Sequence, residues 1–91
     1  MEDKKQNNII LYTKDYCPYC VAAKKLLQSK NLEFKEIDVG ADPALLAEML
    51  EKSEQRRTVP QIIIGDRAIG GFDDMKALHD KGELDSIVYS S

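Results

Sequence analysis

The chain has 91 residues, 43% of them hydrophobic and 32% charged, a composition typical of one small globular domain covering residues 1–91. No run approaches the ~18 consecutive apolar residues of a membrane span, and the polar start of the chain lacks the apolar stretch of a secretory signal, so we expect a reducing, cytoplasmic location. A net charge of -3, a calculated pI near 5.1 and the lack of a basic stripe interleaved with aromatic residues argue against a nucleic-acid partner.

The first half of the chain predicts a strand, a helix and a second strand. Residues 9–13 are rich in β-branched and aromatic side chains, which is typical of a buried strand. Pro18 suits the first turn of a helix because its missing N–H would be unpaired there, and Asn31 is a plausible left-handed stop. Residues 32–39 alternate imperfectly between apolar and charged and predict the second strand. This order indicates a parallel pair with a right-handed crossover.

The next segment predicts a helix and a hairpin. Asp42 can cap a helix that has Pro43 at its first position and that fades near residues 52–55. Residues 61–64 and 67–69 predict two strands joined by a Gly-Asp dipeptide, which fits a two-residue hairpin turn. These two strands should therefore be antiparallel.

The last segment predicts two helices. Gly70-Gly71 breaks the chain before a third helix, which Asp73 could cap and which Gly82 would end. Residues 84–88 suggest one last short helix. The order βαβ, α, ββ, α predicts an α/β fold with a four-stranded mixed sheet (βαβ then ββα) and helices on both faces, an arrangement that resembles the thioredoxin-like architecture.

Both cysteines lie in Cys17-Pro18-Tyr19-Cys20, at the predicted start of the first helix. A free thiol with a pKa near 8.5 is mostly protonated at neutral pH. The helix N-terminus, with Lys14 nearby, would stabilise a thiolate on Cys17. Cys20 lies one turn further on, where it would be packed away from solvent yet able to attack a mixed disulfide on Cys17. We therefore predict a redox site with Cys17 as nucleophile and Cys20 as resolving thiol.

Metal binding is the main chemical alternative, because Cys-x-x-Cys also supplies half of many tetrahedral sites. A second cysteine pair is missing from the sequence and His79 is its one histidine, so we expect neither a structural zinc nor a bound cofactor. A cluster shared between two subunits stays open, since each chain could give one thiolate and a bound thiol the other ligand.

A second constellation is Arg57-Thr58-Val59-Pro60. A cis Val59–Pro60 bond would turn the Val59 backbone toward the cysteines. Its N–H and C=O groups could then pair with a peptide-like substrate in the manner of an added β-strand. An ordinary trans proline at the start of a strand fits the same residues equally well.

A third constellation is Gly70-Gly71-Phe72-Asp73-Asp74. Two glycines allow a close backbone approach, and the helix that follows offers its N-terminal amides to a carboxylate. Asp73 or Asp74 could accept hydrogen bonds from a substrate ammonium. The simpler alternative is that the glycines form a turn and that Asp73 is only a cap.

Together with Tyr12-Thr13-Lys14 before the cysteines, these three segments resemble the dithiol glutaredoxins over nearly the whole chain. The resemblance implies that glutathione is the co-substrate. Lys14 and Arg57 would approach its glycine carboxylate, Val59 its cysteinyl backbone, and Asp73 with Asp74 its γ-glutamyl end, while Pro60 would be cis. The glutathione-binding residues implied in this way are Lys14, Tyr19, Arg57, Thr58, Val59, Pro60, Gly71, Phe72, Asp73 and Asp74.

The implied activity is the reduction of protein–glutathione mixed disulfides and of protein or small-molecule disulfides, by a monomer that acts on client proteins. Two departures from family patterns matter. Phe72 stands where many dithiol members carry an extra cysteine, and the Cys-Gly-Phe-Ser of cluster-assembling monothiol members is absent. The alternatives are a homodimer with a glutathione-ligated 2Fe–2S cluster, and a glutaredoxin-like protein reduced by thioredoxin reductase.

Overall fold

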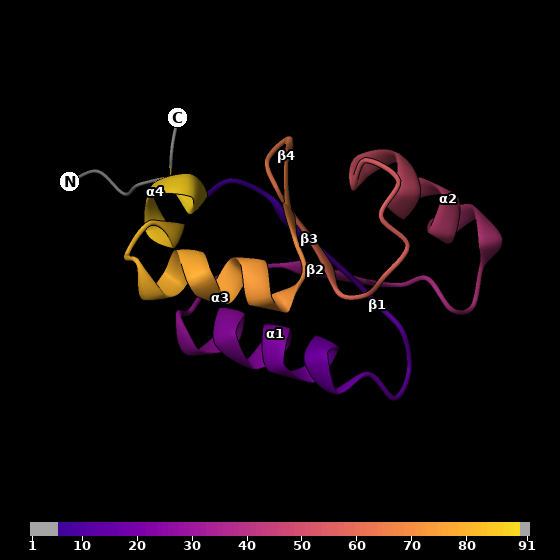
Figure 1. Cartoon of the computed structure of the whole chain (residues 1–91), viewed down its shortest axis with the longest axis horizontal. Coiled ribbons are helices and arrows are strands. Elements are labelled where there is room, and N and C mark those ends of the chain that lie inside the picture. Colours follow the sequence, from indigo (N-terminus) through magenta and orange to yellow (C-terminus); the bar gives the residue numbers. More distant parts are fainter. Residues whose placement is uncertain (1–5, 90–91) are drawn as a thin grey trace.

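The computed structural model describes residues 6–89. Their elements, in chain order, are β1 (Ile9–Thr13), α1 (Pro18–Ser29), β2 (Lys35–Asp38), α2 (Pro43–Lys52), β3 (Gln61–Ile64), β4 (Arg67–Gly70), α3 (Phe72–Asp80) and α4 (Leu84–Val88) (Figure 1). The strand order is β2-β1-β3-β4. Strand β1 pairs parallel with β2 and antiparallel with β3, and β3 pairs antiparallel with β4. The predicted mixed sheet, parallel pair and hairpin are confirmed.

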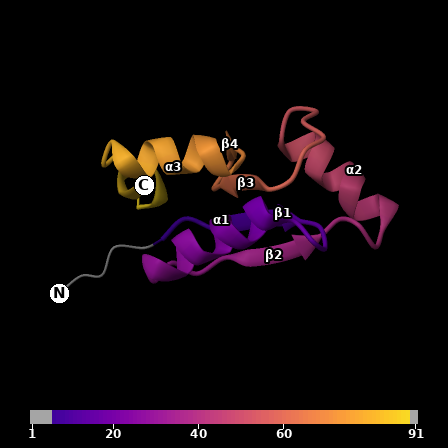
Figure 2. The ribbon, with the colours of Figure 1, turned by 60° about the horizontal axis from the view of Figure 1, so that its bottom comes forward.

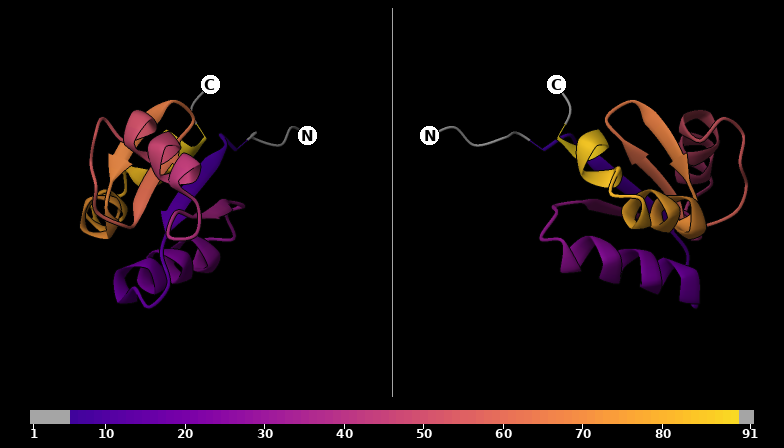
Figure 3. Two further views of the ribbon diagram at one scale, coloured as in Figure 1. Left: turned by 90° about the vertical axis from the view of Figure 1, so that its right-hand side faces the viewer. Right: turned by 60° about the vertical axis from the view of Figure 1, so that its left-hand side comes forward.

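Helices cover both faces of the sheet, as predicted. Successive strand residues point to opposite faces, so Leu11 and Ile62 lie in one core while Tyr12 and Ile63 lie in the other. The first core also receives side chains from α1, α3 and α4, and the second receives Met49 from α2. Figures 1 and 3 show α2 across the sheet from the other helices.

A buried hydrogen bond joins α2 to the sheet. The Tyr12 side chain is fully buried, and its hydroxyl donates to Glu48 Oε2 of α2 over 2.7 Å. Burial, the hydrogen bond and the charge of Glu48 all raise the pKa of the Tyr12 phenol. The Asp42 cap predicted for α2 is present, because its carboxylate accepts the Ala44 N–H over 2.9 Å.

Two predicted boundaries and one predicted cap are wrong. Strand β2 begins at Lys35 instead of residue 32, because the backbone N–H and C=O of Glu33 bond the Gln6 side chain. Strand β4 extends one residue further, to Gly70. Helix α3 begins at Phe72 with Gly71 as its N-cap, so Asp73 lies inside the first turn instead of capping it.

Two backbone predictions are confirmed. Asn31 ends the turn after α1 in the left-handed region, with φ of 57°, and the Val59–Pro60 peptide bond is cis. The loop that carries this bond runs from α2 back to the centre of the sheet, and Figure 2 shows it passing the end of β1. None of the helices in residues 6–89 has the length and apolar character needed to cross a bilayer.

Candidate functional site

Cys17 is the N-cap of α1 and is only partly buried. Pro18 occupies the first helical position, as its fixed φ favours. The Cys17 sulfur accepts a hydrogen bond from the Cys20 N–H over 3.2 Å, so a backbone donor of the first turn points at it. An anion at this position is favoured by the positive end of the helix dipole.

Cys20 lies one turn further along α1 and is 3% exposed. Both cysteines are free thiols. Burial, a hydrogen bond with Cys17 and the charges of Cys17 and Glu36 raise the pKa of the Cys20 thiol to about 12, against a lowering contribution from the Lys14 backbone. The two sulfurs are therefore unequal: one reaches solvent, and the other is buried and held protonated.

The cis-proline loop lies beside the exposed sulfur. Cys17 Sγ is 3.8 Å from the carbonyl oxygen of Val59, within the longer reach of a thiol donor. Gln61 at the start of β3 holds the loop in place. Its buried side-chain amide donates to the Thr58 carbonyl over 2.9 Å and to Thr58 Oγ1 over 3.2 Å. Cys17 and Val59, 42 positions apart in the sequence, thus lie side by side at the Cys17 sulfur.

The start of α3 forms the next part of the site. Gly71 lies against the cis-proline loop, because a Cβ added to it would lie 3.6 Å from the Pro60 carbonyl oxygen. The centre of the Phe72 ring lies 6.4 Å from the centre of the exposed Tyr19 ring. Asp74 accepts the Gly71 N–H over 3.0 Å, and Asp73 is exposed in the same turn. The second and third predicted constellations therefore meet.

Lys14 and Arg57 flank this cluster in the sequence, Lys14 three residues before Cys17 and Arg57 directly before Thr58. Both side chains are exposed, and neither has a hydrogen-bond or ion-pair partner among residues 6–89. Lys14 lines a shallow depression with Asp38 and Gly40, on the β2 side of the cysteines. The structure thus leaves these two cations available to a ligand without joining them to Cys17.

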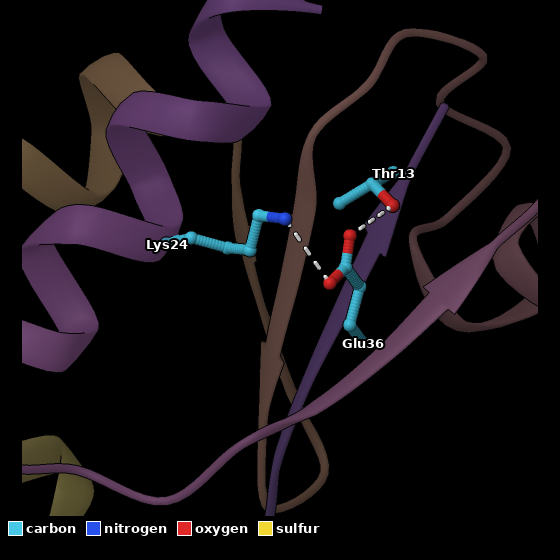
Figure 4. A network of polar contacts seen from close by, with 3 residues as sticks. All are labelled: Thr13, Lys24 and Glu36. Carbon is cyan, nitrogen blue, oxygen red and sulfur yellow. Dashed lines mark hydrogen bonds and ion pairs between the residues drawn. The ribbon is translucent and has the colours of Figure 1, made fainter. Parts of the chain in front are cut away.

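Several site residues were not predicted. Arg56 lies over Gly70, where its Nη1 would be 2.6 Å from an added Cβ. Thr13, Lys24 and Glu36 form a polar network that links β1, α1 and β2 (Figure 4). No local sequence signal indicates this network, because its three side chains come from β1, α1 and β2.

This arrangement can perform thiol–disulfide exchange, in which a thiolate attacks one sulfur of a disulfide and the other sulfur leaves. Cys17 has the exposure and the backbone donor that an attacking thiolate needs, and Cys20 is near enough to attack Cys17 Sγ once another thiol is disulfide-bonded to it. Residues 6–89 contain no group of three or more His, Cys, Asp or Glu side chains placed to hold a metal ion.

Known proteins share this sequence and fold. The glutaredoxin family model matches residues 9–69. A glutaredoxin of Pseudomonas aeruginosa is 45% identical over 80 residues, which cover 88% of this chain and 94% of that one. The solution structure of a glutaredoxin from Brucella melitensis is 50% identical with a TM-score of 0.80, covering 93% of this chain and 91% of that one.

A more distant neighbour was solved with a ligand. The crystal structure of a buckwheat glutaredoxin–glutathione complex is 30% identical to this chain, with a TM-score of 0.79, and covers 90% of this chain and 76% of that one. The family match spans the segment from Cys17 to Cys20, the cis-proline loop and the β3–β4 hairpin up to residue 69. The chain therefore belongs to the glutaredoxin family and is a thiol–disulfide oxidoreductase.

Proposed function

We propose that the protein is a glutathione-dependent oxidoreductase that reduces protein–glutathione mixed disulfides and protein or small-molecule disulfides. The observation that carries this proposal is the position of Cys17 Sγ, 3.8 Å from the Val59 carbonyl. Neither backbone group of Val59 pairs with another backbone group in the part of the chain that the structure describes. A peptide thiol could therefore pair with Val59 as an added strand while its sulfur reaches Cys17.

The charges around Cys17 suit glutathione, a peptide-like thiol with a carboxylate at each end and one ammonium. Lys14 and Arg57 are exposed cations without a side-chain partner among residues 6–89, and they could bind the glycine carboxylate. The first turn of α3 offers its amides to the γ-glutamyl carboxylate, and Asp73 with Asp74 could accept from the ammonium. Glutathione would act here as a co-substrate and not as a resident cofactor.

The proposed monothiol route has two exchanges. The Cys17 thiolate attacks the glutathione sulfur of a mixed disulfide, the client sulfur leaves as a thiolate and takes a proton, and glutathione remains disulfide-bonded to Cys17. A second glutathione thiolate then attacks the bound glutathione sulfur. Oxidised glutathione leaves and Cys17 is regenerated.

Protein disulfides would use both cysteines. Cys17 attacks the client disulfide, and the Cys20 thiolate then attacks Cys17 Sγ, releasing the second client thiol and forming the Cys17–Cys20 disulfide. Two glutathione molecules reduce this disulfide and become oxidised glutathione, so the electrons balance. The burial of Cys20 keeps it from competing with Cys17 for the first attack.

A coupled assay tests the donor and both thiols together. A small glutathione mixed disulfide is supplied with glutathione, glutathione reductase and NADPH, and NADPH oxidation is followed. We expect Cys17→Ser to fall to the background rate, and Cys20→Ser to keep turning over because the monothiol route needs one cysteine. Equal loss in the two variants would contradict the assigned roles, and no turnover by the wild type would refute glutathione dependence.

Two further measurements separate the alternatives. Protein purified without oxygen should be colourless and monomeric, whereas a glutathione-ligated 2Fe–2S cluster shared by two chains would give a coloured dimer. Replacing glutathione and its reductase with thioredoxin reductase should abolish turnover, because no free glutathione is then present to bind beside Val59 and attack the disulfide on Cys17. Turnover with thioredoxin reductase alone would instead favour the other donor.

A further inference from the structure

The cis-proline loop, residues 53–60, is held beside Cys17 mainly from its two ends. Residues 54–58 are all exposed, so their side chains do not pack the loop into a core. Among residues 6–89 three polar side chains are buried, and two of them bound this loop. Ser53 is 0% exposed where α2 ends, and Gln61 is 1% exposed where β3 begins. We call these two side chains the loop anchors.

The Ser53 hydroxyl fixes the first turn of the loop. It accepts from the Arg56 N–H over 3.2 Å and donates to the Arg56 carbonyl over 3.1 Å. The two residues that it spans, Glu54 and Gln55, both have left-handed backbones, with φ of 63° and 71°. This conformation costs free energy in residues other than glycine and persists where the surrounding structure imposes it. Ser53 thus holds a strained turn in place.

The Gln61 side chain fixes the other end of the loop. Its amide nitrogen donates to both the Thr58 carbonyl and Thr58 Oγ1, which uses both of its hydrogens. Its amide oxygen Oε1 is buried with no hydrogen-bond partner among residues 6–89. Burying an unpaired polar atom costs free energy. The gain from this glutamine is therefore the position of Thr58.

The position of Thr58 sets the direction of the next backbone donor. The Thr58–Val59 peptide bond is trans and planar, so the Thr58 carbonyl and the Val59 N–H point in opposite directions. While Gln61 holds the carbonyl, the Val59 N–H is aimed away from Gln61. The Val59 side chain packs against the core on the α2 side, and its carbonyl oxygen lies 3.8 Å from Cys17 Sγ. The anchors thus orient both backbone groups of Val59.

We propose that Ser53 and Gln61 are positioning residues that hold the Val59 backbone in place for a peptide thiol, and so make Cys17 select peptide-like disulfides over others. The proposal rests on the proposed function in taking Val59 as the partner of the peptide. Both anchors act through the loop and touch no substrate. A loop ordered in advance loses less conformational entropy on binding. Without an anchor, binding of the peptide has to order the loop.

The test compares two mixed disulfides that share one coloured aromatic leaving thiol and contain no glutathione. One carries N-acetylcysteine N-methylamide, which has peptide groups and no charge, and the other carries mercaptoethanol. In a Cys20→Ser parent, the Cys17 thiolate attacks the aliphatic sulfur, forms a disulfide with it and releases the aromatic thiolate. Each rate is divided by that of the same disulfide with a small free thiol. The ratio of the two quotients is the peptide selectivity.

We expect the parent to prefer the peptide disulfide about tenfold, the effect of one to two hydrogen bonds. Gln61→Met and Ser53→Ala should each lower this selectivity about three- to tenfold, because the Val59 backbone is no longer held in one orientation. The mercaptoethanol disulfide should react at the parent rate in both variants, since its attack by Cys17 does not use Val59. A general loss of structure would slow both disulfides alike.

The matched control is Tyr12→Phe. Tyr12 pairs with Gln61 across the sheet, and the variant loses a buried hydrogen bond to α2 that involves no loop residue. It should keep the selectivity of the parent. If Gln61→Met does not fold, Thr58→Val decides, because it removes the Oγ1 contact from an exposed residue.

Unchanged selectivity in either anchor variant would overturn the proposal, as would an equal loss in Tyr12→Phe or a parent that does not prefer the peptide disulfide. Failure of the coupled glutathione assay, with the selectivity and its loss as expected, would refute glutathione dependence and leave the role of the anchors standing.

Discussion

At the scale of single residues, Tyr12 shows how one buried hydrogen bond can be tested. Burial and the hydrogen bond that its hydroxyl donates to Glu48 raise its pKa, so the folded state binds the phenol proton more tightly than the unfolded state does. This stabilisation is complete below about pH 10, the pKa of an unfolded tyrosine, and is lost as the pH rises beyond it.

We expect Tyr12→Phe to lower the free energy of unfolding by about 1–2 kcal/mol at neutral pH, because a hydrogen bond to a charged group is lost. Above about pH 10 the difference between the two proteins should shrink. Urea unfolding at neutral and alkaline pH measures both effects. Tyr16→Phe is the matched control, since Tyr16 is fully exposed, and a loss of similar size there would contradict the account.

At the scale of elements, the junction between β4 and α3 depends on glycine. Gly70 has φ of 118°, and a Cβ on it would clash with the Asp74 carboxylate and lie 2.6 Å from Arg56 Nη1. Gly82 also has a positive φ, of 75°, yet a Cβ there would meet nothing within 4 Å. The two positions therefore differ both in crowding and in how far φ lies from the left-handed region that alanine can adopt.

We expect Gly70→Ala to lower the free energy of unfolding by about 1–2 kcal/mol more than Gly82→Ala, because φ of 118° lies further outside the left-handed region open to alanine and the Asp74 carboxylate would have to leave the Gly71 N–H to make room. Denaturant unfolding of the two variants measures the difference. On the proposed function, the displaced Asp74 should also raise the KM for glutathione in Gly70→Ala alone. Equal losses of stability would mean that the crowding at Gly70 relaxes without cost.

At the scale of the whole molecule, the ends of the described chain close the larger core. The Asn7 N–H donates to the Val88 carbonyl over 2.7 Å, and Lys30 at the end of α1 forms an ion pair with Asp85 over 2.8 Å. Leu84 is 1% exposed and packs against side chains from the sheet and from α1. A short helix far from the cysteines thus supports the face of the sheet on which α1 rests.

Truncating Leu84 to alanine should lower the free energy of unfolding by about 2–4 kcal/mol, a large share of the 5–15 kcal/mol typical of a small domain. Leu45→Ala removes the same atoms from a half-buried site on α2 and should cost clearly less. Thermal and urea unfolding give both values. A Leu84→Ala cost no larger than that of Leu45→Ala would show that α4 is dispensable for the core.

The sequence alone determined the order of the elements, the hairpin, the cap at Asp42 and the placement of both cysteines at a helix start. These features depend on local signals, namely hydrophobic periodicity, capping residues and turn dipeptides, which act over a few neighbouring positions. The family resemblance added the cis bond before Pro60, which the local residues left open.

Only the tertiary structure decided what surrounds the sulfurs. The Val59 carbonyl lies beside Cys17 Sγ although the two residues are 42 positions apart, and Glu36 of β2 contacts Thr13 of β1 and Lys24 of α1, because the strand order and the β1–β2 register bring these elements together. The true start of β2 was likewise decided at long range, by Gln6 pairing with Glu33. Contacts of this kind depend on how whole elements pack, so no short stretch of sequence encodes them.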